Sequence, residues 1–217
     1  MKTRSTLGAF PSMLVLVAAA ACARTPAPAA SPAPEPAPAQ VGPEHLPPSA
    51  ADIRFMGEMI GHHAQAIRIS RWAPTHGASD AVQRLAARIV VGQQDEIAIM
   101  QRWLREHGQP VVEPDTAGHA AHGGMDHSAH MPGMLSPADL ATLDAARGEE
   151  FDRLFLTYMI RHHQGALTMV DQLFASQGAA QNDTVFRMAS DVHAEQNSEI
   201  DRMRTMLADL LVSEGSE

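Results

Sequence analysis

Residues 55–67 read FMGEMIGHHAQAI and residues 155–167 read FLTYMIRHHQGAL, so Phe, Met, Ile, two adjacent His and Ala recur at an offset of 100. A second match follows each copy, because residues 93–104 read QQDEIAIMQRWL and residues 196–207 read QNSEIDRMRTML, at an offset of 103. Both of these segments fit the pattern Q-x-x-E-I-x-x-M-x-x-x-L. Two matched segments in the same order indicate an internal duplication.

Each copy predicts a hairpin of two helices. Ser49 and Asp52 are typical of a helix N-terminus, and Ser136 before Pro137 marks a helix start in the second copy, where Gly148 is expected to divide a short helix from a longer one. No useful stretch alternates with period two, so the sequence predicts an all-α, antiparallel four-helix bundle over residues 49–213. The expected helix limits are Ser49 to Pro74 or His76–Gly77, Ser79–Asp80 to Gly108, Ser136 onward through the second copy, and Asn182–Asp183 to about Val212.

The first 48 residues are predicted to be a signal peptide followed by a linker. Residues 1–21 resemble a signal peptide, because Lys2 and Arg4 precede an apolar run that is too short to span a membrane. Three alanines before Cys22, the only cysteine, resemble a bacterial lipoprotein cleavage box and imply a lipid on Cys22. The alternative is ordinary cleavage near Ala21 or Ala23. Residues 22–48, rich in Pro and Ala, are expected to be an extended linker, so the protein is predicted to be exported to the periplasm or cell envelope and anchored to a membrane.

The composition limits the kind of ligand. The formal net charge is -9 and no basic cluster is present, which argues against nucleic acid as a partner. A single Cys leaves the folded domain without a thiolate, whereas 13 Met and 12 His are available. Thioether sulfur and imidazole nitrogen suit soft ions such as Cu(I).

The repeated motif supplies the first group of candidate metal ligands. Residues three and four apart share a helix face, so the Met and the two His of each copy point nearly the same way, and bundle cores are where such sites are built. These candidates are Met59, His62, His63, Met159, His162 and His163.

Two other interpretations of the motif stay open. The Met and His side chains are ordinary core residues in the first. In the second, one His of each pair ligates while the other bonds a carboxylate, and Glu96 and Glu199 are the expected partners. The Gln residues of the same motif, Gln93 and Gln196, are further candidates to pair with the histidines across the bundle. Met100, Met203 and Met206 are expected to fill the core.

The segment between the copies supplies the second group of candidates. Residues 119–134 read HAAHGGMDHSAHMPGM, and their Gly and Pro residues predict a loop, taken as residues 109–135. The segment resembles Met/His-rich stretches of exported bacterial copper-resistance proteins, and it is expected to bind labile ions and to hand them on. The alternative is a polar insertion without a ligand role. The candidates are His119, His122, Met125, His127, His130, Met131 and Met134.

The doubled motifs M-I-x-H-H-x-x-A and Q-x-x-E-I-x-x-M resemble those of the bacterial family known as domain of unknown function 305, over roughly residues 50–210. The resemblance implies a ferritin-like four-helix bundle, export and, for some members, copper binding and copper tolerance. In that family a Met commonly stands seven residues after the first His, which Met169 matches and Ile69 does not. The resemblance therefore adds Met169 as a candidate ligand and favours the second copy for ligation.

These features together predict a non-enzymatic protein that sequesters or transfers Cu(I) and contributes to metal tolerance. Ag(I) and divalent ions are further candidate metal ions, and copper efflux or resistance proteins are candidate partners. One alternative is a ferritin-like di-metal redox enzyme, against which the folded part offers no Glu-x-x-His motif. The others are a generic divalent-ion buffer and a helical interaction module of the envelope. Because ligating imidazoles must be neutral, metal affinity is expected to fall below about pH 6.

Overall fold

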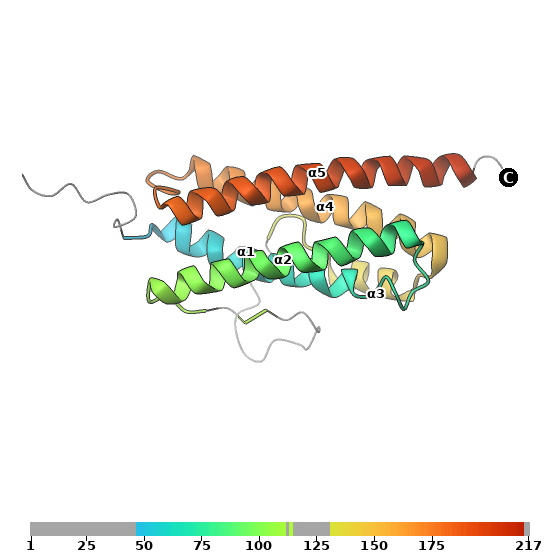
Figure 1. Ribbon diagram of the computed structural model, residues 1–217, viewed down its shortest axis with the longest axis horizontal. Helices are drawn as coiled ribbons and strands as arrows, with labels where there is room; N and C mark the ends of the chain where they lie inside the picture. The colour runs from blue at the N-terminus through green and yellow to red at the C-terminus, as the bar shows by residue number, and fades with distance from the viewer. Residues whose placement is uncertain (1–46, 112, 115–130, 215–217) are drawn as a thin grey trace, which may run out of the picture. The chain divides into compact units, whose positions relative to one another are not determined.

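The computed structural model describes residues 47–111, 113–114 and 131–214, and within these ranges it contains five helices and no strand. The helices are α1 (Ala50–Ser70), α2 (Asp80–Glu106), α3 (Pro137–Ala145), α4 (Gly148–Ala175) and α5 (Asp183–Glu214) (Figure 1). The predicted all-α fold is therefore confirmed. The predicted signal peptide, the linker up to residue 46 with Cys22, and the loop candidates His119, His122, Met125, His127 and His130 lie outside the described residues.

The predicted helix starts are confirmed by their capping bonds. The Ser49 hydroxyl accepts a hydrogen bond from the Asp52 backbone at 3.0 Å, and the Asp52 carboxylate accepts one from the Ser49 backbone at 2.9 Å. The same reciprocal pair joins Ser136 and Asp139 at the start of α3. The expected division into a short and a longer helix is confirmed, because α3 ends at Ala145 and α4 begins at Gly148, which has a φ of 58°. These caps satisfy backbone donors that the first turn of a helix leaves free.

The end of α1 differs from the prediction. The helix ends at Ser70, rather than at Pro74 or His76–Gly77, and residues 71–77 form turns. Pro74 has no N–H to donate to the Ser70 carbonyl and disfavours a helical conformation at the residue before it, so its effect reaches back by a full turn. The ends of α2 and α5, at Glu106 and Glu214, lie two residues from the predicted Gly108 and Val212.

Two equivalent aspartates join the hairpins. Helix α1 packs on α2, α4 packs on α5, and α1 also contacts α4 (Figure 1). Asp52 in α1 accepts a hydrogen bond at 2.7 Å from the backbone of Ala180, in the turn between α4 and α5. Asp152 in α4 accepts one at 3.1 Å from the backbone of Ser79, in the turn between α1 and α2. Because Asp52 and Asp152 occupy the same place in the two copies, each hairpin holds the turn of the other.

The core consists of two apolar clusters. The first apolar cluster includes Phe55, Met59, Met100, Trp103 and Met169, and the second includes Ile69, Phe155, Phe151, Met159 and Met203. The first apolar cluster contains mainly residues from the beginning of α1 and the end of α4. The second contains mainly residues from the end of α1 and the beginning of α4. The histidine pairs stand at the middle of α1 and α4, where one cluster gives way to the other. The predicted packing role of Met100 and Met203 is confirmed by their full burial, and Met206 packs at the edge of the second cluster.

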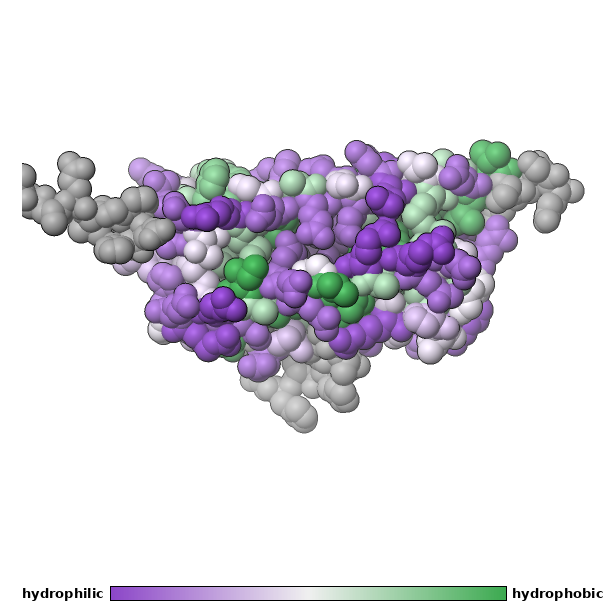
Figure 2. Space-filling view, in the orientation of Figure 1, coloured by the Kyte–Doolittle hydropathy of each residue, from purple (hydrophilic) through white to green (hydrophobic). Residues whose placement is uncertain are grey.

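Hydrophilic side chains dominate the face of the molecule that Figure 2 shows, and the apolar ones form small separate spots on it. Within the described ranges, none of the helices combines the length and the apolar character that a membrane span requires.

The end of the His/Met loop packs tightly on the bundle. We call residues 131–136, which lead into α3, the strap. A Cβ atom added at Gly165 in α4 would collide with the Pro132 carbonyl and stand 2.6 Å from the Cα of Gly133. Gly133 itself has a φ of 77°, which favours glycine. The strap thus lies directly against the backbone of α4.

Gly165→Ala is expected to destabilise the protein by about 1–3 kcal/mol, because backbone atoms cannot yield to the new methyl group as a flexible side chain would. The measurement is the midpoint of thermal unfolding. Gly61→Ala is the matched control, since a Cβ there meets only the flexible Cε of Met131, at 3.6 Å. Equal unfolding midpoints for the two variants would show that the strap does not pack on α4 in this way.

Candidate metal centre

Four histidines meet at the centre of the bundle. His62, His63, His162 and His163 are all fully buried, with 0% exposure. The rings of His62 and His162, one from each copy, have centroids 3.9 Å apart and an angle of 40° between their planes. We call these four residues the histidine cluster. The internal duplication therefore brings the two H-H motifs together, although they are separated by 100 positions in the sequence.

The second histidine of each pair bonds a glutamate within its own hairpin. His63 Nε2 lies 2.7 Å from a carboxylate oxygen of Glu96 in α2, and His163 Nε2 lies 2.7 Å from one of Glu199 in α5. A carboxylate accepts, so each Nε2 carries the proton and donates it, and Nδ1 keeps a lone pair when the ring is neutral. This is the carboxylate pairing that the sequence left open as an alternative.

The first histidine of the first pair bonds the strap. His62 Nε2 lies 3.0 Å from the carbonyl oxygen of Pro132. Because a carbonyl can only accept, Nε2 carries the proton and Nδ1 is the atom with the free lone pair. Burial lowers the pKa of His62 to about 3, helped by the neighbouring His63 and His163 and opposed by the bond to Pro132. His62 is therefore a neutral imidazole at neutral pH.

His162 has no hydrogen-bond partner at either ring nitrogen among the described residues. Burial sets its pKa well below the usual value, and the nearby His62 and His163 lower it further. A buried polar atom without a partner costs free energy, so such an atom in a native protein calls for an explanation, such as an ordered water or an ion.

Several other polar atoms around the histidine cluster also lack partners among the described residues. These atoms are the Nδ1 atoms of His62, His63 and His163, Oε1 of Glu96, and both side-chain polar atoms of Gln93 and Gln196. The Gln of the motif Q-x-x-E thus recurs as a buried, unpaired amide in each copy. The interpretation that these two glutamines pair with the histidines is wrong for the described residues, where their side chains have no hydrogen-bond partner.

The methionines stand on both sides of the histidine cluster. Met59 and Met169 belong to the first apolar cluster, together with the half-buried Met131, whereas Met159 belongs to the second. Met169 therefore shares a cluster with the Met of the first copy, because antiparallel α1 and α4 place the end of one beside the start of the other. Met134 is half-buried in the strap.

Among the described residues, no three His, Cys, Asp or Glu side chains form a group that could hold a metal ion. The unpaired ring nitrogens of His62 and His162 are candidate donors at the histidine cluster. Imidazole nitrogen together with thioether sulfur is suited to a soft monovalent ion rather than to Zn²⁺ or Mg²⁺.

Glu195 is a further acidic residue that the sequence analysis did not single out. Burial raises the pKa of Glu195, and the nearby carboxylates of Glu96 and Glu199 raise it further. At the offset of 103 its counterpart is Gly92, and a Cβ added there would stand 2.8 Å from the Glu195 carboxylate. The Glu195 carboxylate is thus accommodated by the glycine of the other copy.

Glu199→Gln is expected to lower the free energy of unfolding by about 1–3 kcal/mol, because a neutral amide replaces a charged acceptor for buried His163. Loss of this orienting bond is also expected to reduce metal affinity by roughly tenfold to a hundredfold. Glu150→Gln removes an exposed ion pair with Arg153 and serves as the control, with a change of less than about 1 kcal/mol. Denaturant unfolding compares the two variants. A Glu199→Gln protein as stable as the control would contradict the role assigned to this pair.

Comparison with known proteins places the fold and motifs in a family. The model of the family described as domain of unknown function (DUF305) matches residues 52–207. A DUF305 fragment from Deinococcus radiodurans is 30% identical, with a TM-score of 0.63, and the alignment covers 76% of this chain and 99% of that one. A DUF305 protein from Streptomyces coelicolor, itself predicted to be secreted, is 28% identical, with a TM-score of 0.60 and coverage of 74% and 93%.

The third relative is a copper-binding protein. CopM in its Cu(II)-bound form is 26% identical to this chain, with a TM-score of 0.55, and the alignment covers 73% of this chain and 96% of CopM. CopM has also been solved in Cu(I)-bound and Ag-bound forms. A comparison with curated proteins gives no match.

Proposed function

This protein belongs to the DUF305 family, and from that premise we propose that it is an extracytoplasmic protein that sequesters or transfers Cu(I), and also Ag(I), through His and Met side chains. The metal ion is its cargo, and the proposal includes no catalytic step. The role is metal tolerance in the periplasm or cell envelope, with a lipid on Cys22 as the membrane anchor and copper efflux or resistance proteins as partners.

One observation carries the proposal: the centroids of the buried rings of His62 and His162 lie 3.9 Å apart, and Nδ1 of His62 and both ring nitrogens of His162 lack hydrogen-bond partners among the described residues. An imidazole binds metal only when neutral, and the low pKa of both residues keeps them so. Histidines that ligate metals commonly donate the other ring N–H to a carbonyl or carboxylate. His62 does so to Pro132, and His63 and His163 do so to glutamates.

The choice of metal rests on two supports. Thioethers favour Cu(I), and three methionines, Met59, Met131 and Met169, pack in the cluster on one side of the histidines. CopM, which has the same fold, binds copper and silver. The loop candidates between residues 119 and 130 add capacity for labile ions.

Anaerobic competition titration against a chromophoric Cu(I) chelator tests the proposal. The parent protein is compared with a variant in which the four loop histidines, His119, His122, His127 and His130, are replaced by Ala. The strap is left intact in this variant because it is part of the packed fold. We expect the variant to lose part of the capacity and to keep a tight site. Loss of all tight binding would confine the function to the loop, and no tight binding by the parent would contradict copper binding altogether.

A further inference from the structure

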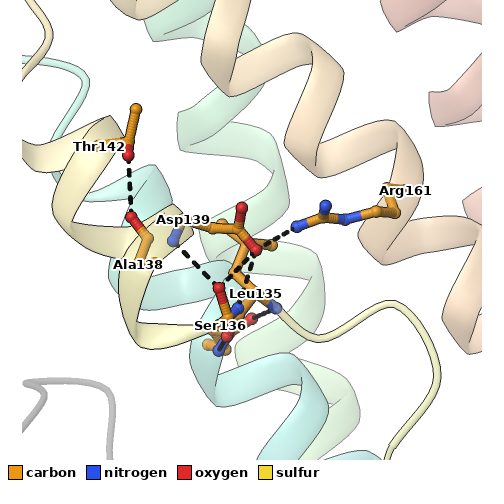
Figure 3. Close-up of polar contacts among 7 residues, drawn as sticks. Leu135, Ser136, Ala138, Asp139, Thr142 and Arg161 are labelled. Atoms are coloured by element: carbon orange, nitrogen blue, oxygen red, sulfur yellow. Dashed lines mark hydrogen bonds and ion pairs between the residues drawn. The ribbon is translucent and has the colours of Figure 1, made fainter.

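The strap is fastened to both copies of the duplicated unit. On the α1 side, the Gln65 amide bonds both backbone groups of Leu135, accepting from its N–H at 2.7 Å and donating to its carbonyl at 3.1 Å. On the α4 side, Arg161 donates to the Asp139 carboxylate at 2.7 Å, and the same carboxylate accepts a hydrogen bond from the backbone N–H of Ser136 at 3.0 Å (Figure 3). Partial burial raises the pKa of Asp139, but the bonds from Ser136 and Arg161 outweigh this and hold it below its usual value. Asp139 is therefore ionised when it bonds Arg161.

The strap also explains where the two copies differ. Gly61 in α1 corresponds to Arg161 in α4, and Gln65 corresponds to Gly165. Gln65 bonds the strap at Leu135, and its counterpart Gly165 leaves room for the strap backbone. Arg161 bonds Asp139 in α3, and its counterpart Gly61 leaves room for the side chain of Met131. The Pro132 carbonyl engages His62 and leaves its counterpart His162 unpaired. The strap therefore makes the two halves of the histidine cluster unequal.

Met131 is a strap residue with a soft sulfur atom, and it lies where the strap meets α1. Its Cε lies 3.6 Å from the position of a Cβ on Gly61, and Gly61 precedes His62 directly. The next strap residue, Pro132, holds His62 by its carbonyl. Met131 is half-buried, so it reaches solvent while it packs against the first apolar cluster, to which Met59 belongs. His62, in contrast, has no exposed surface.

Resting on the proposed function, we propose that Met131 is the loading ligand of the buried centre. Its thioether binds Cu(I) or Ag(I) at the surface and passes the ion to Nδ1 of His62. The transfer exchanges one metal–sulfur bond for one metal–nitrogen bond. No proton is released, because Nδ1 of the neutral ring already carries a lone pair, and no electron moves. The strap gives the ion one preferred side of approach, through the copy to which Met131 is attached.

The test follows the rate of loading by anaerobic stopped flow, with Cu(I) supplied as its complex with a chromophoric chelator. The protein in which the four loop histidines are Ala serves as the parent, so that the loop does not mask the buried centre. Met131→Leu keeps a similar volume and apolar contact, and Met206→Leu, at a partly buried methionine packed on the second apolar cluster, is the matched control. We expect Met131→Leu to slow loading by about tenfold, with final occupancy and unfolding midpoint close to those of the parent, and Met206→Leu to load at the parent rate.

The outcomes separate this inference from the proposed function. A parent that takes up no Cu(I) would contradict a buried copper site. A parent that loads, together with a Met131→Leu variant that loads equally fast, would overturn the role of Met131 and leave the function standing. A variant with reduced final occupancy and an unchanged rate would make Met131 a resident ligand, which also overturns the loading role.

Discussion

The His162→Leu variant is expected to be more stable than the parent protein without metal and to bind Cu(I) roughly a hundredfold less tightly. Both ring nitrogens of His162 are buried without a partner among the described residues. Removing an unpaired buried polar group relieves a cost of about 1–3 kcal/mol, and Leu fills a similar volume with apolar atoms. A residue retained at such a cost is one that serves binding rather than stability.

His163→Leu is the matched comparison, because His163 is equally buried but bonds Glu199 at 2.7 Å. Its removal leaves a carboxylate oxygen without its partner, so this variant is expected to lose stability. Denaturant unfolding in the presence of a metal chelator measures both effects, and anaerobic titration measures the affinities. If His162→Leu lost stability to the same degree as His163→Leu, His162 would be a structural polar residue and not a ligand.

The stability of the metal-free protein is expected to fall as the pH is lowered from about 6.5 to about 3. His62 has a pKa of about 3 in the folded protein, against 6.5 as its usual value. Between these two values the unfolded chain binds a proton that the native state does not, so acid favours unfolding. The full difference corresponds to about 5 kcal/mol by the time pH 3 is reached, and above about pH 6.5 this contribution to stability is complete. His162 acts in the same direction.

Denaturant unfolding at neutral, mildly acidic and acidic pH, with a chelator present, measures this dependence. His62→Leu is expected to flatten the curve, whereas His193→Ala, which alters an exposed histidine of α5, leaves it unchanged. An unaltered pH dependence in His62→Leu would show that His62 does not titrate in this way. The low pKa also changes the expectation from the sequence, since metal affinity at His62 is not limited by protonation at about pH 6, as it is for an ordinary imidazole.

The sequence was sufficient for the fold because the signals for it are local. The capping residues Ser49 and Ser136 and the break at Gly148 act within a few positions, and the duplicated motifs show that the same unit occurs twice. The limit of α1 was placed too late, because Pro74 affects the turn before it. The pairing of His63 and His163 with Glu96 and Glu199 was foreseen as an alternative from the order of the motifs.

The strap and its consequences were not predictable from local pattern. Pro132 and Gly133 indicate a loop, but no periodicity shows that this loop end packs on Gly165 or bonds His62. The difference between Gln65 in one copy and Gly165 in the other is explained only by their contacts with the strap. The presence of Met169 in the same apolar cluster as Met59 likewise depends on how α1 and α4 pack, which the spacing within one helix cannot reveal.

Nitrogen NMR of the histidine side chains, in protein labelled with ¹⁵N-histidine, tests the central claim most directly. Ag(I) is the probe because it is diamagnetic and does not change oxidation state during the titration. We predict that one equivalent of Ag(I) shifts the Nδ1 resonance of His62 and a ring nitrogen of His162, with assignments checked by His62→Leu and His162→Leu. Shifts confined to other histidines, with both of these unchanged after saturation, would contradict a metal site at the centre of the bundle.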